Sequence, residues 1–422
     1  MDPVDFGSFQ VALHRQGSTR HAPVTYPVRY GTYSEIRTRD YVFQFDLNGD
    51  IKYIQGRRDR WPAGDEWLKR TIADDWVFYA TSGEYSRLFA LLGEYYLPCF
   101  TYPTNTIYSR RLRKRGLADA LGALAALRGE IRTAVSRVSS GPLHSFLTAV
   151  AAADGRARAQ RAQRLHALLG ARLPVLPPDT RHVDYNVVPL ILAEGCLYDC
   201  SFCRVKSGGR FRRRGQAEVT AQIRGLAEHF GPELANYNAV FLGQHDALHA
   251  GEAAIEHAAR LAHEGLGLDR SLLDGRFLFL FASVHSLVHA SESLYTMLDR
   301  LPYRTYLNVG LESFHQEALQ ALGKPLQVAE VREAFGRMQD LNRRYANLEV
   351  TANLVLGREL PPGHLEAILE QAGRGLDRDC SKGALYLSPM DGPDQARQTM
   401  RELFSVKRAS RLPTFLYLIQ RL

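Results

Sequence analysis

Six short apolar runs recur between residues 187 and 390, and stretches with the apolar spacing of amphipathic helices separate them. The runs are rich in Val, Leu, Ile and Phe, and several of them end in glycine. Continuous apolar runs of this length are typical of parallel strands whose faces are covered by helices. The pattern therefore predicts an α/β fold in the C-terminal half, a partial (β/α)6 TIM-like barrel. The six runs are 187–195, 239–243, 276–284, 305–313, 349–357 and 383–390.

Residues 1–181 depart from this pattern and predict an α+β domain in front of the barrel. Residues 41–56 alternate apolar and polar side chains around an Asn-Gly pair, which predicts a hairpin because both residues tolerate positive φ. Residues 75–81 predict a further strand, and apolar residues recur at helical spacing from 116 to 173. The segment 173–182 holds three prolines and is the best linker candidate. We place the N-terminal domain at 1–181, the barrel at 182–392 and a C-terminal helical extension at 393–422.

Three of the five cysteines follow the first apolar run directly, as Cys196, Cys200 and Cys203 in a C-x3-C-x2-C spacing. A structural zinc site takes four protein ligands, and the chain has no second cysteine pair, since Cys99 and Cys380 are distant in sequence. A four-iron cube held by three thiolates keeps one iron without a protein ligand, and that iron can bind a substrate or a cofactor. The spacing therefore favours a [4Fe-4S] cluster with one open corner over the zinc alternative.

The segment CLYDCSFC, residues 196–203, matches the C-x3-C-x-aromatic-C signature of radical S-adenosylmethionine (AdoMet) enzymes, with Phe202 as the aromatic residue. The sequence resembles this superfamily over about residues 185–390, roughly half of the chain. The resemblance implies a partial (β/α)6 barrel with the cysteine loop after its first strand, in agreement with the strand pattern. It also implies two cofactors, a [4Fe-4S] cluster and AdoMet, in an oxygen-sensitive enzyme whose subfamily the motifs do not identify.

The resemblance further implies AdoMet contacts after the second and third strands. The family often has a Gly-Gly-Glu-like turn that binds the methionine amino group after the second strand. Gly243 fits this turn, but Gln244 and His245 stand where Gly and Glu are common, which leaves Asp246 as a candidate acidic acceptor. Ser283 follows the third strand at the rim of the barrel.

The later strands carry further candidate AdoMet contacts by the same resemblance. Glu312, at the end of the fourth strand, resembles the residue that holds the ribose hydroxyls, with Asn308 and Ser313 nearby. The fifth strand resembles the family's G-x-I-x-G-x-x-E region, in which Leu354 and Leu356 would flank the adenine.

The chemistry implied by the resemblance starts with the open iron, which the amino and carboxylate groups of AdoMet chelate. One electron then cleaves a carbon–sulfur bond, and the resulting 5′-deoxyadenosyl radical takes a hydrogen atom from the substrate. We expect the substrate to be a small metabolite or natural-product intermediate, anionic in view of the net charge of +8. Modification of RNA or a nucleotide is one alternative, and a non-catalytic iron–sulfur or zinc binding module is another.

Two basic runs, 109–115 and 209–214, are candidates for contact with an anionic partner. The second run follows the cysteine loop closely, so its arginines are expected near the mouth of the site. Their partner is either the substrate or an acidic electron donor, flavodoxin or ferredoxin, and a solvated loop face is the alternative. The aromatic side chains of 75–111 either stack on a ring system or form the core of the N-terminal domain.

Several other classes of protein do not fit the sequence. No run of about 18 consecutive apolar residues is present, so no membrane span is expected. The first residues include acidic side chains and no apolar run, and the cysteines form no disulfide framework, so we expect a cytoplasmic protein. The cobalamin signature D-x-H-x-x-G is absent, since DALHAG at Asp246 has a different spacing, and cobalamin-dependent methyl transfer is not expected.

Overall fold

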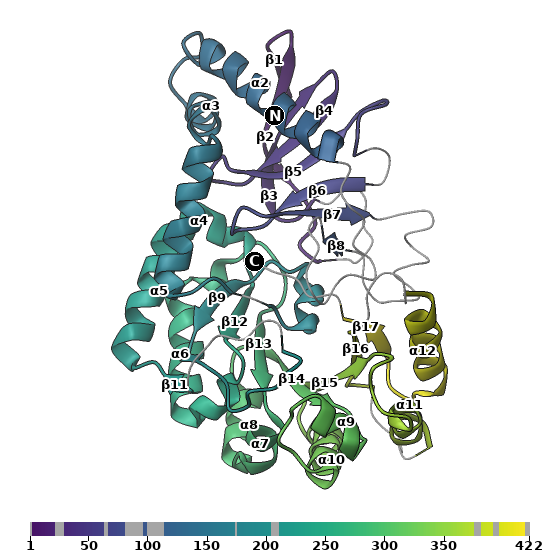
Figure 1. Cartoon of the computed structure of the whole chain (residues 1–422). Helices are drawn as coiled ribbons and strands as arrows, with labels where there is room; N and C mark the ends of the chain where they lie inside the picture. The colour runs from purple at the N-terminus through teal and green to yellow at the C-terminus, as the bar shows by residue number, and fades with distance from the viewer. Residues whose placement is uncertain are drawn as a thin grey trace.

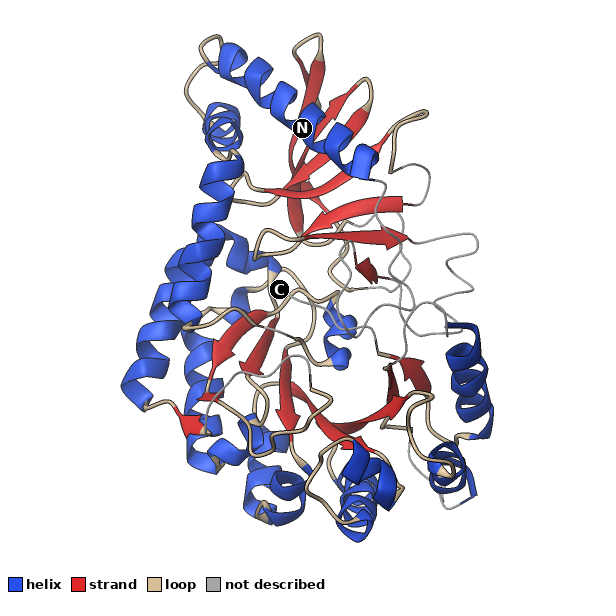
Figure 2. Ribbon diagram, in the orientation of Figure 1, coloured by secondary structure: helices blue, strands red, loops and turns tan. Residues whose placement is uncertain are grey.

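The computed structural model describes residues 2–21, 29–62, 66–80, 96–98, 114–173, 175–203, 211–374, 381–390 and 396–417. In these residues the chain forms an antiparallel sheet near its N-terminus and a parallel sheet in its C-terminal half, connected by a row of helices (Figure 1). The helices of the second half lie around the outer side of the parallel sheet (Figure 2). This arrangement confirms the predicted partial barrel with an α+β domain in front of it.

Within the described residues, the parallel sheet has seven strands in the order β17-β16-β15-β14-β13-β12-β9. Each of the six apolar runs contains one strand, and all neighbouring strands pair in parallel. The seventh strand, β17, follows the helix α12 and pairs with β16, so the segment after residue 393 holds a strand as well as the expected helix. The strands are β9 (Val188–Ile191), β12 (Ala239–Gly243), β13 (Phe277–Ala282), β14 (Arg304–Glu312), β15 (Leu348–Leu356), β16 (Leu385–Pro389) and β17 (Thr414–Leu416).

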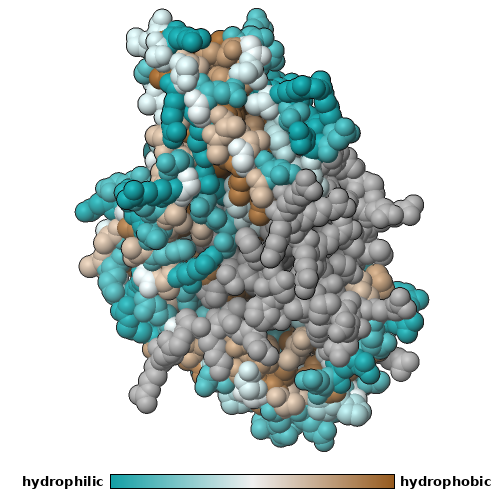
Figure 3. Space-filling view, turned by 45° about the horizontal axis from the view of Figure 1, so that its top comes forward, coloured by the Kyte–Doolittle hydropathy of each residue, from teal (hydrophilic) through white to brown (hydrophobic). Residues whose placement is uncertain are grey.

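The helices that cover this sheet bury one apolar face each. In α10, Val331, Phe335 and Met338 are buried at helical spacing, and the Glu330 carboxylate accepts a hydrogen bond from the backbone N–H of Gln327 to cap the first turn. Figure 3 shows many hydrophilic side chains on the outer surface of the molecule. The helices are α5 (Gln216–Phe230), α6 (Glu252–Gly265), α7 (Val284–His289), α8 (Glu292–Arg300), α9 (Gln316–Ala321), α10 (Val328–Arg344), α11 (His364–Leu369) and α12 (Ala396–Ala409). Shorter helical turns are η1 (Pro178–Val183), η2 (Gly231–Asn236), η3 (Ala247–Ala250), η4 (Leu268–Arg270) and η5 (Glu370–Arg374).

In the part of the N-terminal half that the structure describes, the sheet is an antiparallel meander of eight strands in sequence order. The expected hairpin over 41–56 is present, and Gly49 in its turn has a φ of 77°, which favours glycine. The strands are β1 (Val4–Asp5), β2 (Phe9–Gln16), β3 (Thr32–Thr38), β4 (Tyr41–Phe45), β5 (Ile51–Gly56), β6 (Glu66–Arg70), β7 (Trp76–Ala80) and β8 (Tyr96–Pro98). In the described residues that follow, three helices cover most of the range 116–173 for which helical spacing was predicted: α2 (Lys114–Val135), α3 (Pro142–Ala152) and α4 (Gly155–Leu169).

The proline-rich segment between the two halves is folded against the amino-terminal end of the barrel. Its turn η1 buries Asp179 and Thr180 completely. The guanidinium of Arg181 lies 3.8 Å from the ring centroid of Phe415, and the ring of His182 stacks on Tyr306 at 4.9 Å. The linker therefore closes the base of the barrel and is part of its core.

The N-terminal sheet docks on the same end of the barrel, opposite the carboxyl ends of the strands. The β4–β5 turn contacts η2, the turn that leads into β12: Leu47 N donates to Glu233 Oε2 at 3.0 Å and Asn48 Nδ2 donates to Phe230 O at 2.8 Å. Lys52 forms an ion pair with Glu233 at 2.7 Å. The described part of the N-terminal domain thus supports the barrel from below.

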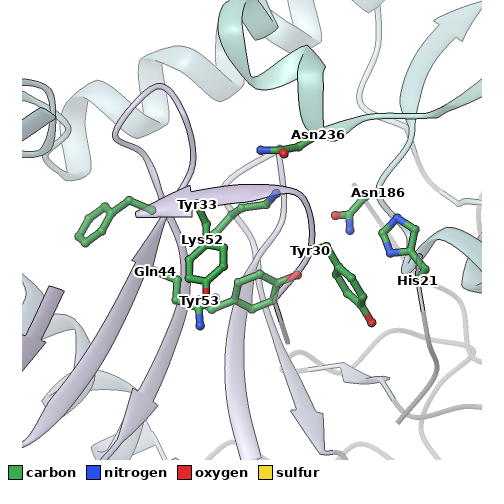
Figure 4. A pocket seen from close by; sticks show the side chains of 9 residues that line it. His21, Tyr30, Tyr33, Gln44, Lys52, Tyr53, Asn186 and Asn236 are labelled. Atoms are coloured by element: carbon green, nitrogen blue, oxygen red, sulfur yellow. The ribbon is translucent and has the colours of Figure 1, made fainter. Parts of the chain in front are cut away.

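A small buried pocket lies at this junction. Figure 4 shows Lys52 and Tyr53 from the N-terminal sheet together with Asn186 and Asn236 from the barrel side. Burial, together with the positive charges of Lys69 and Lys52, lowers the pKa of His21, another lining residue, to about 3, so the imidazole is neutral at pH 7. This pocket lies at the amino-terminal end of the barrel strands, whereas the cysteine loop lies at their carboxyl end.

None of the helices in the described ranges combines the length and the apolar character that crossing a bilayer requires.

The docking turn carries a carboxyl group whose charge is unfavourable. Asp46 Oδ1 accepts hydrogen bonds from the backbone N–H groups of Asn48 (2.9 Å) and Asp50 (2.8 Å). Burial raises the pKa of Asp46, and the neighbouring carboxylates of Glu233 and Asp50 raise it further. An acid whose pKa is raised by folding lowers stability at every pH above its unfolded pKa, because ionisation then favours the unfolded chain.

We expect Asp46→Asn to raise the free energy of unfolding by about 1 kcal/mol at pH 8, because an amide keeps the accepting oxygen and carries no charge. The gain should shrink as the pH falls and disappear below the ordinary pKa of 3.8, where the carboxyl is protonated in both the folded and the unfolded state. Urea unfolding at several pH values measures it. Asp40→Asn, at the exposed ion pair with Arg60, is the control and should change stability by less than about 0.5 kcal/mol. A less stable Asp46→Asn variant at pH 8 would contradict the assignment.

Candidate active site

The cysteine loop leaves the barrel through a two-stranded hairpin. After β9 the chain forms β10 (Ala193–Glu194), which pairs antiparallel with β11 (Arg212–Arg213). Two backbone hydrogen bonds attach this hairpin to the end of β12, from Leu192 N to Gly243 O (2.8 Å) and from Gln244 N to Ala193 O (3.0 Å). The three cysteines between β10 and β11 therefore begin at the carboxyl end of the first barrel strand.

None of the three cysteines forms a disulfide, and they differ in exposure. Cys200 is buried, whereas Cys196 and Cys203 are half-buried, and Cys203 N donates to Cys200 O at 3.3 Å. Burial raises the pKa of Cys200 to about 11 and also raises that of Cys196, so both are protonated until a cationic centre displaces the proton. Among the described residues, no three His, Cys, Asp or Glu side chains are arranged around one point as ligands of a single metal ion. In an iron–sulfur cube each thiolate binds a different iron, so the three sulfurs lie farther apart than the ligands of a single metal ion.

The loop is held from two sides below the cysteines. Tyr198 OH accepts a hydrogen bond from the backbone N–H of His285 at 3.1 Å, at the start of α7. Ser201 N donates to Leu322 O at 3.0 Å, in the turn after α9. Gly323 in that turn has a φ of 64°, and a Cβ there would lie 2.9 Å from Ser201 N. A side chain at this position would push the cysteine loop away. Phe202 is half-buried in the same loop.

The second basic run is engaged within the fold at every described position. Arg214 donates to Glu194 Oε1 at 2.6 Å and to Leu169 O at 2.6 Å, with its side chain 9% exposed. Arg212 pairs with Glu194 at 3.1 Å and with Glu218 at 3.2 Å. Arg213 donates to the carbonyl of Ala250 at 3.2 Å. The contact with an anionic partner that we expected for this run stays a prediction. In the described residues, Arg212 and Arg214 bind Glu194 and so form a clasp that connects the two ends of the cysteine loop.

Glu312 and Lys324 form a buried ion pair beside the cysteines. Lys324 Nζ donates to Glu312 Oε1 at 3.0 Å and also to the carbonyl of Gly310, and the side chains are 4% and 13% exposed for lysine and glutamate. Both charges act on the pKa of Cys200, Lys324 lowering it and Glu312 raising it. Lys324 was not among the residues predicted from the sequence. The one sequence signal for it is a lysine that follows a glycine after a short helix, in a chain whose basic residues are mostly arginine.

The turn after β12 places its polar groups differently from the expectation. Asp246 is 1% exposed, and its carboxylate accepts hydrogen bonds from Ser283 N (3.2 Å) and Ser286 Oγ (2.8 Å). Burial raises its pKa. Asp246 therefore ties the ends of β12 and β13 together and is not a free acceptor. Gln244 is buried beside the cysteine hairpin, and its Oε1 accepts no hydrogen bond from the described residues.

Ser283 and Ser313 also have structural roles in the fold. Ser283 caps α7, accepting a hydrogen bond on Oγ from the backbone N–H of Ser286 at 3.0 Å. Ser313 is fully buried and lies 2.8 Å from His364 Nδ1, while His364 Nε2 is 2.9 Å from the carbonyl of Val355.

Because side chains alternate along a strand, Leu354 and Leu356 of β15 point away from the barrel interior. Thr351 and Asn353 point to the face that carries Asn308, because both hydrogen-bond with it across the strands. Leu354 and Leu356 are buried on β15, and alternation assigns them to the opposite face, which packs under the helices. This geometry does not support their side chains as contacts of an adenine in the barrel. Val355 shares the face of Asn353.

Asn308 lies deeper than the other candidates. It is fully buried, with its amide bonded to Thr351 and Asn353, so it is not available to a ribose.

Cys99, Cys380, Arg210 and residues 109–113 lie outside the described residues.

Residues 190–372 match the sequence model of the Radical SAM superfamily. No curated protein matches the chain. Among solved structures, the chain is similar to a radical SAM methyltransferase from Sphaerobacter thermophilus, with 16% identity, 72% of this chain and 93% of that chain covered, and a TM-score of 0.40. It is similar to methylornithine synthase with 11% identity, coverages of 68% and 81%, and a TM-score of 0.33.

A further similar structure is TsrM, a radical S-adenosylmethionine methyltransferase from Kitasatospora setae, with 17% identity, coverages of 48% and 36%, and a TM-score of 0.33. The chain thus spans little more than a third of the length of TsrM, and TM-scores of this size add nothing to the argument. The sequence match and the C-x3-C-x2-C loop show that residues 190–372 of this chain form a domain of the radical SAM superfamily, whose enzymes use a [4Fe-4S] cluster and AdoMet.

Proposed function

We propose that this chain binds a [4Fe-4S] cluster through Cys196, Cys200 and Cys203 and uses AdoMet to start a radical reaction on a small molecule. The observation that carries the proposal is the placement of the cysteine loop. It leaves the carboxyl end of the first strand of a parallel barrel, beside a buried Glu312–Lys324 pair. When bound, the cluster supplies the electron that cleaves AdoMet.

The polar groups around the loop fit the parts of AdoMet one by one. Gln244 Oε1 is a buried acceptor without a donor in the described residues, which suits the ammonium group of the methionine part. Lys324 is a buried cation that suits its carboxylate, and Glu312 is an acceptor that suits the ribose hydroxyls. The Glu312–Lys324 pair keeps both charges compensated before the ligand arrives.

A small substrate suits the described residues better than a nucleic acid. Glu194 and Glu218 compensate the arginines of the second basic run, which leaves less free positive charge for a phosphate backbone. The net charge of +8 is the remaining support for an anionic substrate and for an acidic electron donor such as flavodoxin or ferredoxin. Cysteine usage supports action in the cytoplasm.

Anaerobic reconstitution tests the proposed function directly. We expect about four irons and four sulfides per chain, as one cube requires, and formation of 5′-deoxyadenosine from AdoMet with dithionite as reductant. Replacement of the three loop cysteines by alanine should abolish both, whereas alanine at Cys99 and Cys380 should retain both. Full iron content in the triple variant, or a zinc stoichiometry of one without sulfide, would refute the proposal.

Removal of the Glu312 charge should weaken AdoMet binding without loss of the cluster. For Glu312→Gln we expect the AdoMet concentration at half-maximal cleavage to rise about tenfold or more, the scale of one lost charge-assisted hydrogen bond, with unchanged iron content. Glu349→Gln is the matched control, since Glu349 is likewise an ion-paired glutamate on a barrel strand, but it pairs with Arg304 near the amino-terminal end. An unchanged half-saturation in Glu312→Gln would remove Glu312 from the AdoMet site.

Loss of the arginine clasp should loosen the cluster loop. We expect Arg214→Gln to speed iron loss to a chelator several-fold, because it leaves Glu194 with one partner and frees the carbonyl of Leu169. Arg212→Gln should have a smaller effect, since Arg212 is 52% exposed and its ion pairs are screened by water. Equal rates of iron loss for Arg214→Gln and wild type would show that the clasp does not hold the loop.

A further inference from the structure

A continuous chain of polar side chains runs through the interior of the barrel, from the linker at its base toward the AdoMet site. Its first member is Asp179 in η1, and its last is Asn353 on β15. Thr351 Oγ1 lies 2.7 Å from Asp179 Oδ2 and 2.9 Å from Asn308 Nδ2. The amides of Asn308 and Asn353 bond to each other in both directions, at 3.1 Å and 2.5 Å. Tyr386 OH bonds to the other oxygen of Asp179, at 2.7 Å.

The carboxylate at the base fixes the direction of every hydrogen bond above it. Burial raises the pKa of Asp179 to about 6, so the carboxylate form prevails at pH 8 and can only accept. Thr351 must therefore donate its single hydroxyl proton to Asp179, and its oxygen is left to accept from Asn308 Nδ2. That contact sets which end of the Asn308 amide faces Thr351. The paired amide of Asn353 is thereby set as well, with its oxygen toward Asn308 Nδ2.

Only the upper end of this chain reaches the open part of the barrel. Asp179, Thr351 and Asn308 are completely buried, and Tyr386 is 1% exposed, whereas Asn353 is 8% exposed. Asn353 is the register partner of Gly310, and the next pair along the sheet is Leu354 with Glu312. A Cβ at Gly310 would lie 2.4 Å from Glu312 Oε1, so the Glu312 carboxylate lies over Gly310 on the interior face. The Asn353 amide is therefore next to the group that we assign to the ribose.

We propose that Asp179, through Thr351 and Asn308, is a positioning residue that holds the Asn353 amide in one orientation for contact with AdoMet beside Glu312. This inference rests on the proposed function, because it takes AdoMet as the occupant of the pocket. It gives the linker between the two domains a role in cofactor binding. If the Asn353 amide could flip, its Nδ2 donor would replace its Oδ1 acceptor, and the reverse, in a fraction of the molecules. That fraction would offer AdoMet the wrong hydrogen-bonding group, so the affinity for AdoMet would fall.

Two neighbouring hydroxyls allow a matched test. Thr351→Val and Tyr386→Phe each take one donor from Asp179, at the same 2.7 Å distance and with similar burial. Only Thr351 continues to Asn308 and Asn353. A structural role of the buried carboxylate alone predicts similar effects of the two variants, whereas positioning of Asn353 predicts an effect on AdoMet for Thr351→Val only. Thr351→Ser keeps the hydroxyl and is the conservative rescue.

The measurements are made at pH 8 on cluster-loaded protein, with equilibrium binding of AdoMet before reduction and half-saturation of AdoMet cleavage after it. We expect Thr351→Val to raise the dissociation constant and the half-saturation about five- to tenfold, roughly the value of one oriented hydrogen bond. Tyr386→Phe and Thr351→Ser should stay within about twofold of wild type. Unfolding of the cluster-free proteins should show comparable losses of stability for Thr351→Val and Tyr386→Phe, since both leave a buried carboxylate oxygen without a donor.

The outcomes separate the two levels of the argument. Wild-type protein that carries a cluster but neither binds nor cleaves AdoMet would refute the proposed function and this inference with it. Wild-type activity together with equal AdoMet affinity in Thr351→Val and Tyr386→Phe would refute the inference alone. A Thr351→Val effect that persists unchanged in an Asn353→Ala background would also refute it, because the chain would then act by another route than Asn353.

Discussion

Parallel pairing of the barrel strands is the constraint on which the whole proposed site depends. Because all seven strands run in the same direction, their carboxyl ends meet at one edge, and residues distant in sequence come together there. Cys196, Gln244 and Ser283 follow three different strands, and Glu312 is the last residue of a fourth. The pairing itself is stabilised by burial of continuous apolar runs under the helices, so the packing of the sheet also assembles the site.

The two ends of the barrel have different tasks. The carboxyl ends carry the cysteine hairpin, the Glu312–Lys324 pair and the buried Gln244 oxygen. The amino ends carry the linker turn η1 and the docked N-terminal sheet. Within the described residues, the N-terminal sheet contacts the barrel at its base. In the proposal made above, Asp179 in the neighbouring linker turn is the residue that connects this base with the interior of the barrel.

Local sequence patterns predicted those features that depend on local physics. Short apolar runs predicted the six strands of the sheet, and the Asn-Gly pair predicted the β4–β5 hairpin, because both follow from side-chain alternation and backbone freedom. The cysteine spacing predicted the loop and its family. Features that depend on partners distant in sequence were not predictable: the engagement of Arg212 and Arg214 by Glu194, the fold of the proline-rich linker, and the added strand β17.

The sequence alone determined the superfamily, the barrel and the three cysteines as candidate cluster ligands, because each depends on residues that are close together in the chain. Tertiary structure decided which polar side chains around them are free. Asp246 and Asn308 have suitable chemistry for AdoMet, but neighbouring strands and helices already occupy their hydrogen-bonding groups. Asn353 points into the interior because its amide bonds to Asn308. Side chains alternate along β15, so Leu354 and Leu356 point to the opposite face. Lys324 gains its place only through the turn that folds it back over β14, where burial gives its charge a partner in Glu312.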